Sequence, residues 1–89
     1  MSEEKLTFGT VAAATAGRDK GRMFVVLRIE NGKAFIADGK TRKLCKPKCK
    51  NVKHLKPTTM RIPTDGLTDK SLRKLLNAAV QKENTTQDL

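Results

Sequence analysis

The strongest pattern in the sequence is an alternation of apolar and polar positions after Arg22. Over residues 22–30 the even positions mix apolar and charged side chains, whereas every odd position is apolar. These odd positions are Met23, Val25, Leu27 and Ile29. A period of two is typical of a β-strand that buries one face. The pattern therefore predicts a strand over 22–30 with its odd positions in the core.

The dipeptide Asn31-Gly32, directly after this strand, predicts a tight hairpin. A type I′ turn needs positive φ at both central residues, which Asn and Gly tolerate best. Such a turn fixes the register of the next strand. The expected pairs are Glu30 with Lys33, Ile29 with Ala34, Arg28 with Phe35, and Leu27 with Ile36. They join opposite charges at the turn and apolar residues on the core side, so pattern and register agree.

Weaker signals on both sides of the hairpin predict further short elements. In chain order these are a strand over 6–14 that bends at Gly9, a hairpin turn at Asp38-Gly39, its continuation over 40–44, a cationic loop over 45–51 and a closing strand over 52–55. Glycine inside a strand pattern marks a bend or bulge, and Asp-Gly marks a tight turn. Closely spaced turns of this kind are typical of a small barrel.

Near the C-terminus the period of the apolar positions changes from two to about 3.6. The residues that follow this helical spacing are Leu72, Leu75, Leu76, Ala79 and Val80. Thr68 is the expected N-cap, and Asp69 lies in the first turn, where a carboxylate complements the helix dipole. The apolar stripe is expected to dock on the rest of the domain, with a partner protein as the alternative.

Together these elements predict a mostly β fold class, a small barrel of about five short strands followed by a C-terminal amphipathic helix. A chain of 89 residues is long enough for one such domain. The expected organisation is a flexible N-terminus over 1–5, a barrel over 6–58, a connector over 59–67, the helix over 68–83 and a frayed tail over 84–89.

Positive charge is concentrated in one part of the chain. The sequence has 19 basic and 9 acidic residues, a net charge of +10, and 13 of the basic but only three of the acidic residues fall within 17–57. The whole excess therefore lies on the predicted barrel, where it attracts polyanions, most commonly nucleic acid. No apolar run approaches the roughly 18 residues of a membrane span, and the acidic start is unlike a signal peptide, so we expect a cytoplasmic protein without a membrane partner.

The most informative basic stretch is a turn that two glycines bracket. Gly17 and Gly21 lie four residues apart, directly before the longest apolar run, and the cations between and after them are Arg18, Lys20 and Arg22. Glycine lets the backbone take positive φ and turn tightly. The turn therefore predicts a rigid loop that presents cations to a phosphate backbone.

A second basic segment, residues 40–50, follows the predicted hairpin. Its lysines alternate around Pro47, which favours an extended chain able to lie along a nucleic-acid backbone. Together with the glycine turn, named here the first basic loop (residues 17–22), it supplies most of the predicted RNA contacts. The full set is Arg18, Lys20, Arg22, Lys40, Arg42, Lys43, Lys46, Lys48, Lys50 and Lys53.

The remaining reactive and aromatic residues do not point to catalysis. Cys45, Cys49 and His54 supply three ligands where zinc usually takes four, so we expect free thiols, no metal and no cofactor. No Ser/His/Asp set, paired carboxylates or phosphate loop is present, so we expect neither an enzyme nor a small-molecule substrate. Without Trp or Tyr, base reading by an aromatic sheet is not expected, and Arg28 and Phe35 are expected to pack together.

Several of these segments resemble the KOW motif. They are FGTV at 8–11, AGRDKGR at 16–22 and the alternating strand up to Ile29. The continuation KNVKHL at 50–55 is similar to small bacterial KOW-domain RNA-binding proteins akin to the fourteen-e family of large-subunit ribosomal proteins. The resemblance covers about residues 6–58. It implies an SH3-like barrel whose loops bind RNA, most often ribosomal RNA.

Residues and resemblance together predict an RNA-binding protein of the translation apparatus. It is expected to bind structured ribosomal RNA of the large subunit through its basic loops, as a monomeric ribosomal or ribosome-associated protein, with ribosomal proteins as further partners. An alternative is a protein-interaction module of the transcription or translation machinery that binds through the helix stripe. A third interpretation is a nonspecific DNA binder.

Overall fold

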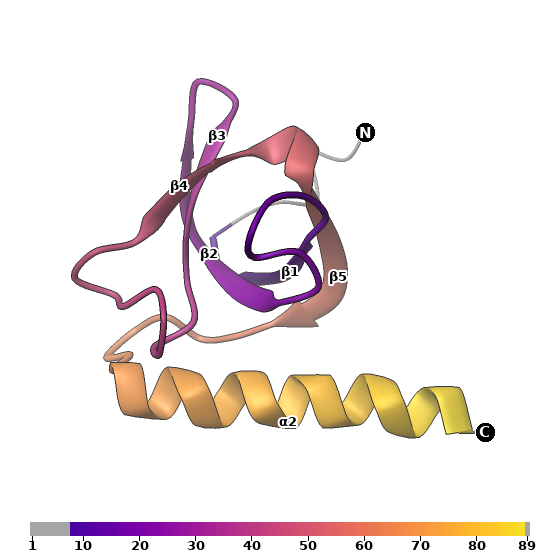
Figure 1. Cartoon of the computed structure of the whole chain (residues 1–89). Helices are drawn as coiled ribbons and strands as arrows, with labels where there is room; N and C mark the ends of the chain where they lie inside the picture. The colour runs from indigo at the N-terminus through magenta and orange to yellow at the C-terminus, as the bar shows by residue number, and fades with distance from the viewer. Residues whose placement is uncertain (1–7, 89) are drawn as a thin grey trace.

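The computed structural model describes residues 8–88, with side chains up to residue 79. Five strands form one antiparallel sheet of order β4-β3-β2-β1-β5. The elements are β1 (Thr10–Ala14), β2 (Met23–Glu30), β3 (Lys33–Ala37), β4 (Lys48–Asn51), the 3-10 helix η1 (Val52–His54), β5 (Leu55–Arg61) and α2 (Asp69–Asp88). The sheet curls into an open barrel, and α2 lies across its outer surface (Figure 1). The predicted fold class, mostly β with a C-terminal helix, is confirmed, although the barrel is not closed.

A β-bulge at Leu27 decides which face of β2 points into the barrel. The first three expected pairs, from Glu30–Lys33 to Arg28–Phe35, are confirmed, but the fourth is wrong because Val26, not Leu27, lies opposite Ile36. The extra residue reverses the alternation, since side chains on a strand alternate strictly between faces. The odd positions therefore do not form a single buried face: Val25 and Leu27 pack beneath α2, whereas Ile29 packs in the barrel interior.

The bulge divides the apolar side chains between two cores. The barrel interior contains Ala12, Ala14, Phe24, Val26, Ala34, Ile36, Val52 and Leu55, with Ile29 packed against them. The second core, between the sheet and α2, contains Val11, Val25, Ala37, Ile62, Leu72 and Leu76. The centre of the sheet is thus buried on both faces. Three of the interior residues are alanines, whose small side chains let a short sheet curl tightly around Phe24.

Several predicted boundaries are wrong, chiefly around the second basic segment. Residues 40–44 form turns rather than a strand, whereas Lys48–Asn51, expected in a loop, pairs with β3 as an edge strand. Val52–His54 forms a 3-10 turn, and the closing strand β5 runs from Leu55 into the expected connector. Pairing with an available sheet edge outweighs the weak strand propensity of lysine-rich residues. The expected N-terminus over 1–5 and the first two residues of the strand over 6–14 lie outside the described residues.

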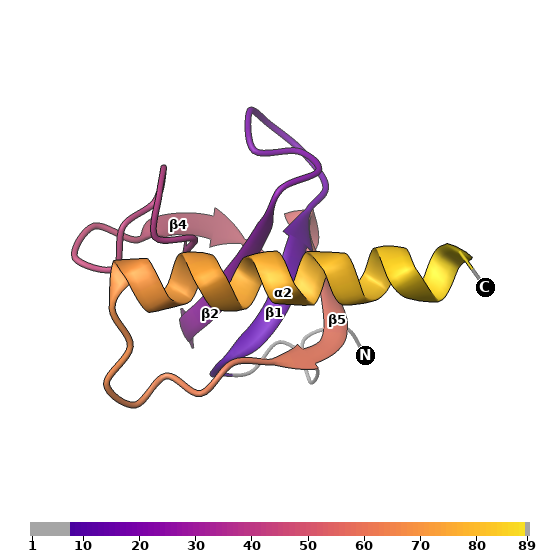
Figure 2. The same cartoon turned by 90° about the horizontal axis from the view of Figure 1, so that it is seen from below.

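The helix α2 begins as expected and docks on the sheet. Thr68 is the N-cap, since its Oγ1 accepts a hydrogen bond from the Ser71 N–H at 3.1 Å. Leu72 and Leu76 are buried beneath the helix, which crosses β2 and β1 (Figure 2). The expected end at residue 83 is wrong, because the helix continues to Asp88. None of the helices in the described chain combines the length and apolarity needed to cross a membrane.

Candidate nucleic-acid interface

The first basic loop is a hydrogen-bonded turn, as its glycines predict. Gly17 and Gly21 have φ of 79° and 87°, a conformation that side-chain-bearing residues avoid. The backbone N–H of Gly21 donates to the Ala14 carbonyl at 2.9 Å, and the Arg22 N–H donates to the Asp19 carbonyl at 2.9 Å. These bonds close the turn. The side chains of Arg18, Lys20 and Arg22 remain exposed on it.

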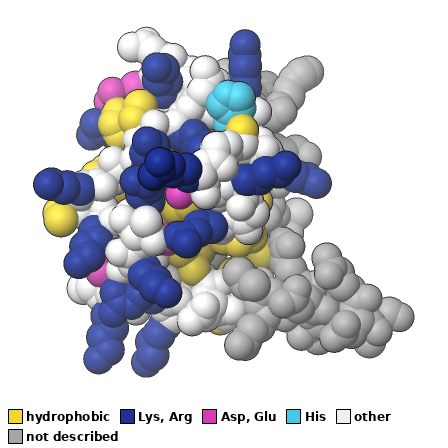
Figure 3. Space-filling view, viewed as in Figure 1, with side chains coloured by type: hydrophobic (Ala, Val, Ile, Leu, Met, Phe, Trp, Pro, Cys, Tyr) yellow, Lys and Arg dark blue, Asp and Glu magenta, His cyan; other side chains and the backbone are white. Residues whose placement is uncertain are grey.

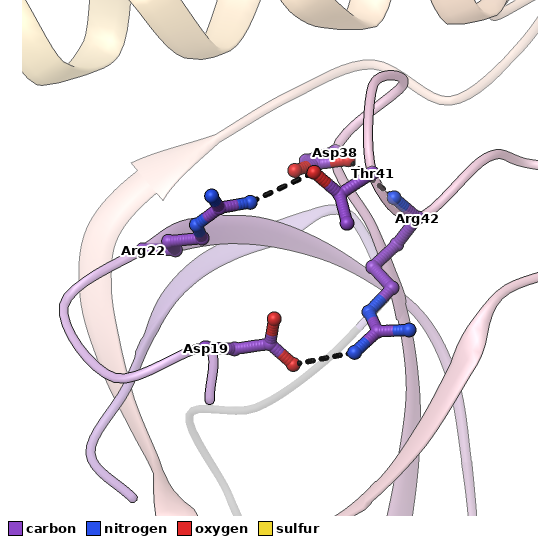
Figure 4. Close-up of polar contacts among 5 residues, drawn as sticks. All are labelled: Asp19, Arg22, Asp38, Thr41 and Arg42. Carbon is purple, nitrogen blue, oxygen red and sulfur yellow. Dashed lines mark hydrogen bonds and ion pairs between the residues drawn. The ribbon is translucent and has the colours of Figure 1, made fainter. Parts of the chain in front are cut away.

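Asp19, the acidic residue inside this loop, points inward. It is only 4% exposed, and its carboxylate forms an ion pair with Arg42, Nη2 to Oδ2, at 3.1 Å (Figure 4). On the rim of the same turn, Arg22 Nη1 donates to Thr41 Oγ1 at 2.7 Å. Two loops about 20 residues apart in sequence are therefore tied together. Arg42 was predicted to contact RNA, but the structure gives it an internal partner.

The second basic segment is folded into turns over much of its length, so the expected extended arm is wrong there. The backbone N–H groups of Asp38 and Gly39 both donate to the Arg42 carbonyl, at 2.8 and 3.0 Å. The Asp38 carboxylate in turn accepts from the N–H groups of Lys40 and Arg42. A side-chain acceptor that satisfies nearby backbone donors stabilises a compact turn. The lysines of this turn, Lys40 and Lys43, are exposed.

The extended part of the segment is β4, which brings Lys50 close to the first basic loop. Lys48 and Lys50 lie opposite Ile36 and Ala34, on the face of the sheet that lines the barrel. Lys50 is half-buried, and its Nζ comes within 3.4 Å of the position that a Cβ on Gly17 would occupy. Inward-pointing charges on an edge strand also discourage pairing with another chain.

Basic side chains are prominent on one face of the molecule (Figure 3). Lysine and arginine side chains spread over the side that carries both loops, with few carboxylates among them (Figure 3). Arg42 and Lys50 are half-buried, and the other eight are exposed: Arg18, Lys20, Arg22, Lys40, Lys43, Lys46, Lys48 and Lys53. Lys53 lies on η1, which is held beside β1 by a hydrogen bond from the Thr15 N–H to the His54 carbonyl.

Sequence reasoning missed the cations at the start of α2. Lys70, Arg73 and Lys74 are exposed, and Arg73 Nη1 donates to the Gly39 carbonyl at 2.7 Å. The loop and the helix are joined a second time by Asp69, whose carboxylate accepts from the Leu44 N–H at 2.8 Å. The available signal was the spacing of the three cations, i, i+3 and i+4, which places them on one side of a helix. A count of net charge over the segments that flank the barrel hid this cluster, because basic and acidic residues balance there.

The cysteines and the Arg28–Phe35 pair take no part in these hydrogen bonds between the loops and α2. Cys45 and Cys49 are exposed free thiols. Among the described side chains, residues 8–79, no group of three or more His, Cys, Asp or Glu is placed to hold a metal ion. The Arg28 guanidinium lies 4.2 Å from the centre of the Phe35 ring, so the expected packing of these two residues is confirmed.

The sequence matches no family model, and the comparison with curated proteins finds no significant match. The likeness to KOW proteins therefore depends on the sequence segments alone.

Proposed function

We propose that this protein binds structured RNA, and specifically ribosomal RNA of the large subunit, as a ribosomal or ribosome-associated component of the translation apparatus. The observation that carries the proposal is the joining of two cationic loops by Asp19–Arg42 and Arg22–Thr41. Loops held in this way keep the backbone positions that carry their exposed cations in a fixed arrangement. A backbone arranged in advance loses less conformational entropy when its cations contact phosphates.

The composition of this face favours phosphate and shape recognition over base reading. Its exposed residues are lysines and arginines, which supply affinity through counterion release. The chain has no Trp or Tyr, and Phe35 is covered by Arg28. Proteins stack unpaired bases on exposed aromatic rings of this kind, so this surface offers little for base stacking. A folded RNA, whose phosphates stand at fixed spacings, suits this surface better than a flexible single strand does.

The test removes the three exposed cations of the first basic loop. The variant Arg18→Gln, Lys20→Gln, Arg22→Gln is compared with the parent for binding to purified large-subunit ribosomal RNA at several salt concentrations. Each phosphate contact contributes about 0.7–0.9 to the slope of log K against log salt. Three lost contacts should therefore weaken binding roughly 100- to 500-fold at 0.1 M salt and reduce the slope by about 2 to 3.

A control with the same charge change replaces cations elsewhere: Arg28→Gln, Lys33→Gln, Arg61→Gln. Like Arg22, Arg61 donates one exposed hydrogen bond, in its case to the Phe8 carbonyl at 2.9 Å. The control should bind within about threefold of the parent, since its cations lie outside the proposed interface. If the loop variant binds as tightly as the control, or if the parent prefers duplex DNA to the ribosomal RNA, the proposal fails.

The alternative, a partner protein bound to the helix stripe, receives less support from the burial of that stripe. Leu72 and Leu76 are covered by the sheet, which leaves Leu75, 36% exposed, as the large apolar residue available among the described side chains of α2. Association with ribosomes that resists salt and is lost with Leu75→Asp would favour this alternative. Association that is lost steeply with salt and survives Leu75→Asp would favour RNA binding.

A further inference from the structure

A groove lies between α2 and the turn at residues 38–43. Its volume is about 850 Å³. It is lined by Arg22, Met23, Asp38, Gly39, Lys40, Lys43, Lys70, Arg73, Lys74, Leu76 and Asn77. The turn forms one wall and the helix the other, and Met23 and Leu76 add apolar side chains to the lining. Segments about 30 residues apart in sequence thus create a single concave surface.

Six of the residues that line the groove are cations, against a single carboxylate. That carboxylate, Asp38, already accepts two backbone hydrogen bonds through Oδ1, at 2.9 and 2.8 Å. The ion pairs among the described side chains are Arg28–Glu30 and Asp19–Arg42, so no described carboxylate forms an ion pair with a groove cation. Like charges held around one concavity raise the local potential, which favours an anionic occupant.

The two walls of the groove are fixed relative to each other. Arg73 donates to the Gly39 carbonyl at 2.7 Å, and the Asp69 carboxylate accepts from the Leu44 N–H. The helix backbone comes so close to Gly39 that a Cβ there would collide with the Asp69 carbonyl. The lysines of both walls are exposed, while the backbones that carry them are held together by these contacts. The groove is therefore present before any ligand arrives.

We infer that this groove is a second phosphate-binding site, which takes the sugar–phosphate backbone of the same RNA that the first basic loop contacts. Arg22 belongs to both surfaces, so an RNA strand that leaves the loop can enter the groove without a gap in positive charge. Four of the six cations are lysines, compact charges on flexible stems that suit repeated phosphates better than one planar group. The inference rests on the proposed function and adds α2 to the RNA-binding surface.

The test neutralises the helical wall alone. Lys70→Gln, Lys74→Gln changes two exposed side chains that make no hydrogen bond or ion pair with other described residues, so the fold should be preserved. Loss of two phosphate contacts should weaken binding to large-subunit ribosomal RNA roughly 25- to 60-fold at 0.1 M salt and lower the salt slope by about 1.4–1.8. The charge-retaining variant Lys70→Arg, Lys74→Arg should bind like the parent.

The matched control Lys33→Gln, Arg61→Gln removes the same charge outside the groove. If it loses as much affinity as the helical variant, the effect is one of net charge and the groove is not a site. The inference is also overturned if the helical variant, Lys70→Gln, Lys74→Gln, binds RNA as tightly as the parent. In that case the proposed function still stands if the variant of the first basic loop loses binding.

A competition experiment uses free ATP and inorganic tripolyphosphate as competitors of the RNA. Displacement of RNA from the parent and not from the helical variant at equal occupancy supports a phosphate site in the groove, and equal displacement from both argues against it.

Discussion

Replacement of Asp19 by alanine tests the link between the two basic loops most directly. The Asp19 side chain is 6% exposed, and that of its partner Arg42 is 28% exposed. Arg42 Nε is buried without a hydrogen-bond partner in the described part of the chain, so Asp19 supplies the only side-chain acceptor of this guanidinium. A hydrogen bond between charged groups contributes about 1.5–3 kcal/mol. We therefore expect Asp19→Ala to lower the free energy of unfolding by about 1.5–3 kcal/mol.

The assay is urea unfolding followed by far-ultraviolet circular dichroism, because the chain has no Trp or Tyr to serve as a fluorescent probe. A loss of that size lowers Tm by roughly 6–24 °C in a domain of this length. The control is Glu30→Ala, which removes the exposed pair Arg28–Glu30, with 58% of the Glu30 side chain in solvent. Such a pair contributes about 0–1 kcal/mol. If the two variants unfold alike, Asp19 does not hold the loops together.

The same variant separates preorganisation from net charge in RNA binding. Loss of a carboxylate makes the protein more positive, which alone would raise RNA affinity. If the Asp19–Arg42 pair fixes the loop cations in place, their release costs about 0.5–1.5 kcal/mol for each side chain that must be ordered again. We expect affinity for large-subunit ribosomal RNA to fall about two- to tenfold at a temperature where the variant is folded. Tighter binding than the parent would refute this role for Asp19.

Two further variants test how α2 is docked. Gly39→Ala should lower the free energy of unfolding, measured in urea, by more than about 2 kcal/mol, and Gly21→Ala by only about 1–2 kcal/mol. Both glycines have positive φ, but of the two only Gly39 faces a backbone carbonyl, that of Asp69. Equal losses would contradict this close approach. Leu72→Ala should lower the free energy of unfolding by about 2–5 kcal/mol, because Leu72 is fully buried. Leu75→Ala, at an exposed position of the same helix, should lower it by less than about 1 kcal/mol. Similar melting temperatures of the two variants would show that the helix does not pack through Leu72.

Local features were predictable wherever a short stretch of sequence determines the conformation. The Asn31-Gly32 hairpin formed with positive φ at both residues, and the first three pairs of its register were correct. The first basic loop and the Thr68 cap were also correct, because glycine and a capping hydroxyl act within a few residues of their own positions. Alternation predicted β2 itself, but not the bulge, since an extra residue leaves no mark in a pattern that is apolar on both sides of it.

The tertiary structure decided which cations are available to a ligand and which are used internally. In the sequence, Arg42 is not distinguishable from the other cations of the second basic segment. In the structure its ion pair with the inward-pointing Asp19 links the two loops. Lys48 and Lys50 became part of a strand because β3 had an unpaired edge beside them. These outcomes depend on contacts between distant segments, which local propensity and charge counts do not contain.

By itself, the sequence determined a small basic β domain with a helix at its end, because period, turn residues and net charge are properties of the chain. Only the folded arrangement placed Lys70 and Lys74 across a groove from Lys40 and Lys43. The reason is physical: α2 buries Leu72 and Leu76 on the sheet, and this packing fixes which side of the helix faces the turn at residues 38–43. Packing of α2 on the sheet, together with the hydrogen bonds of Arg73 and Asp69 to the turn, therefore set the shape of the cationic surface.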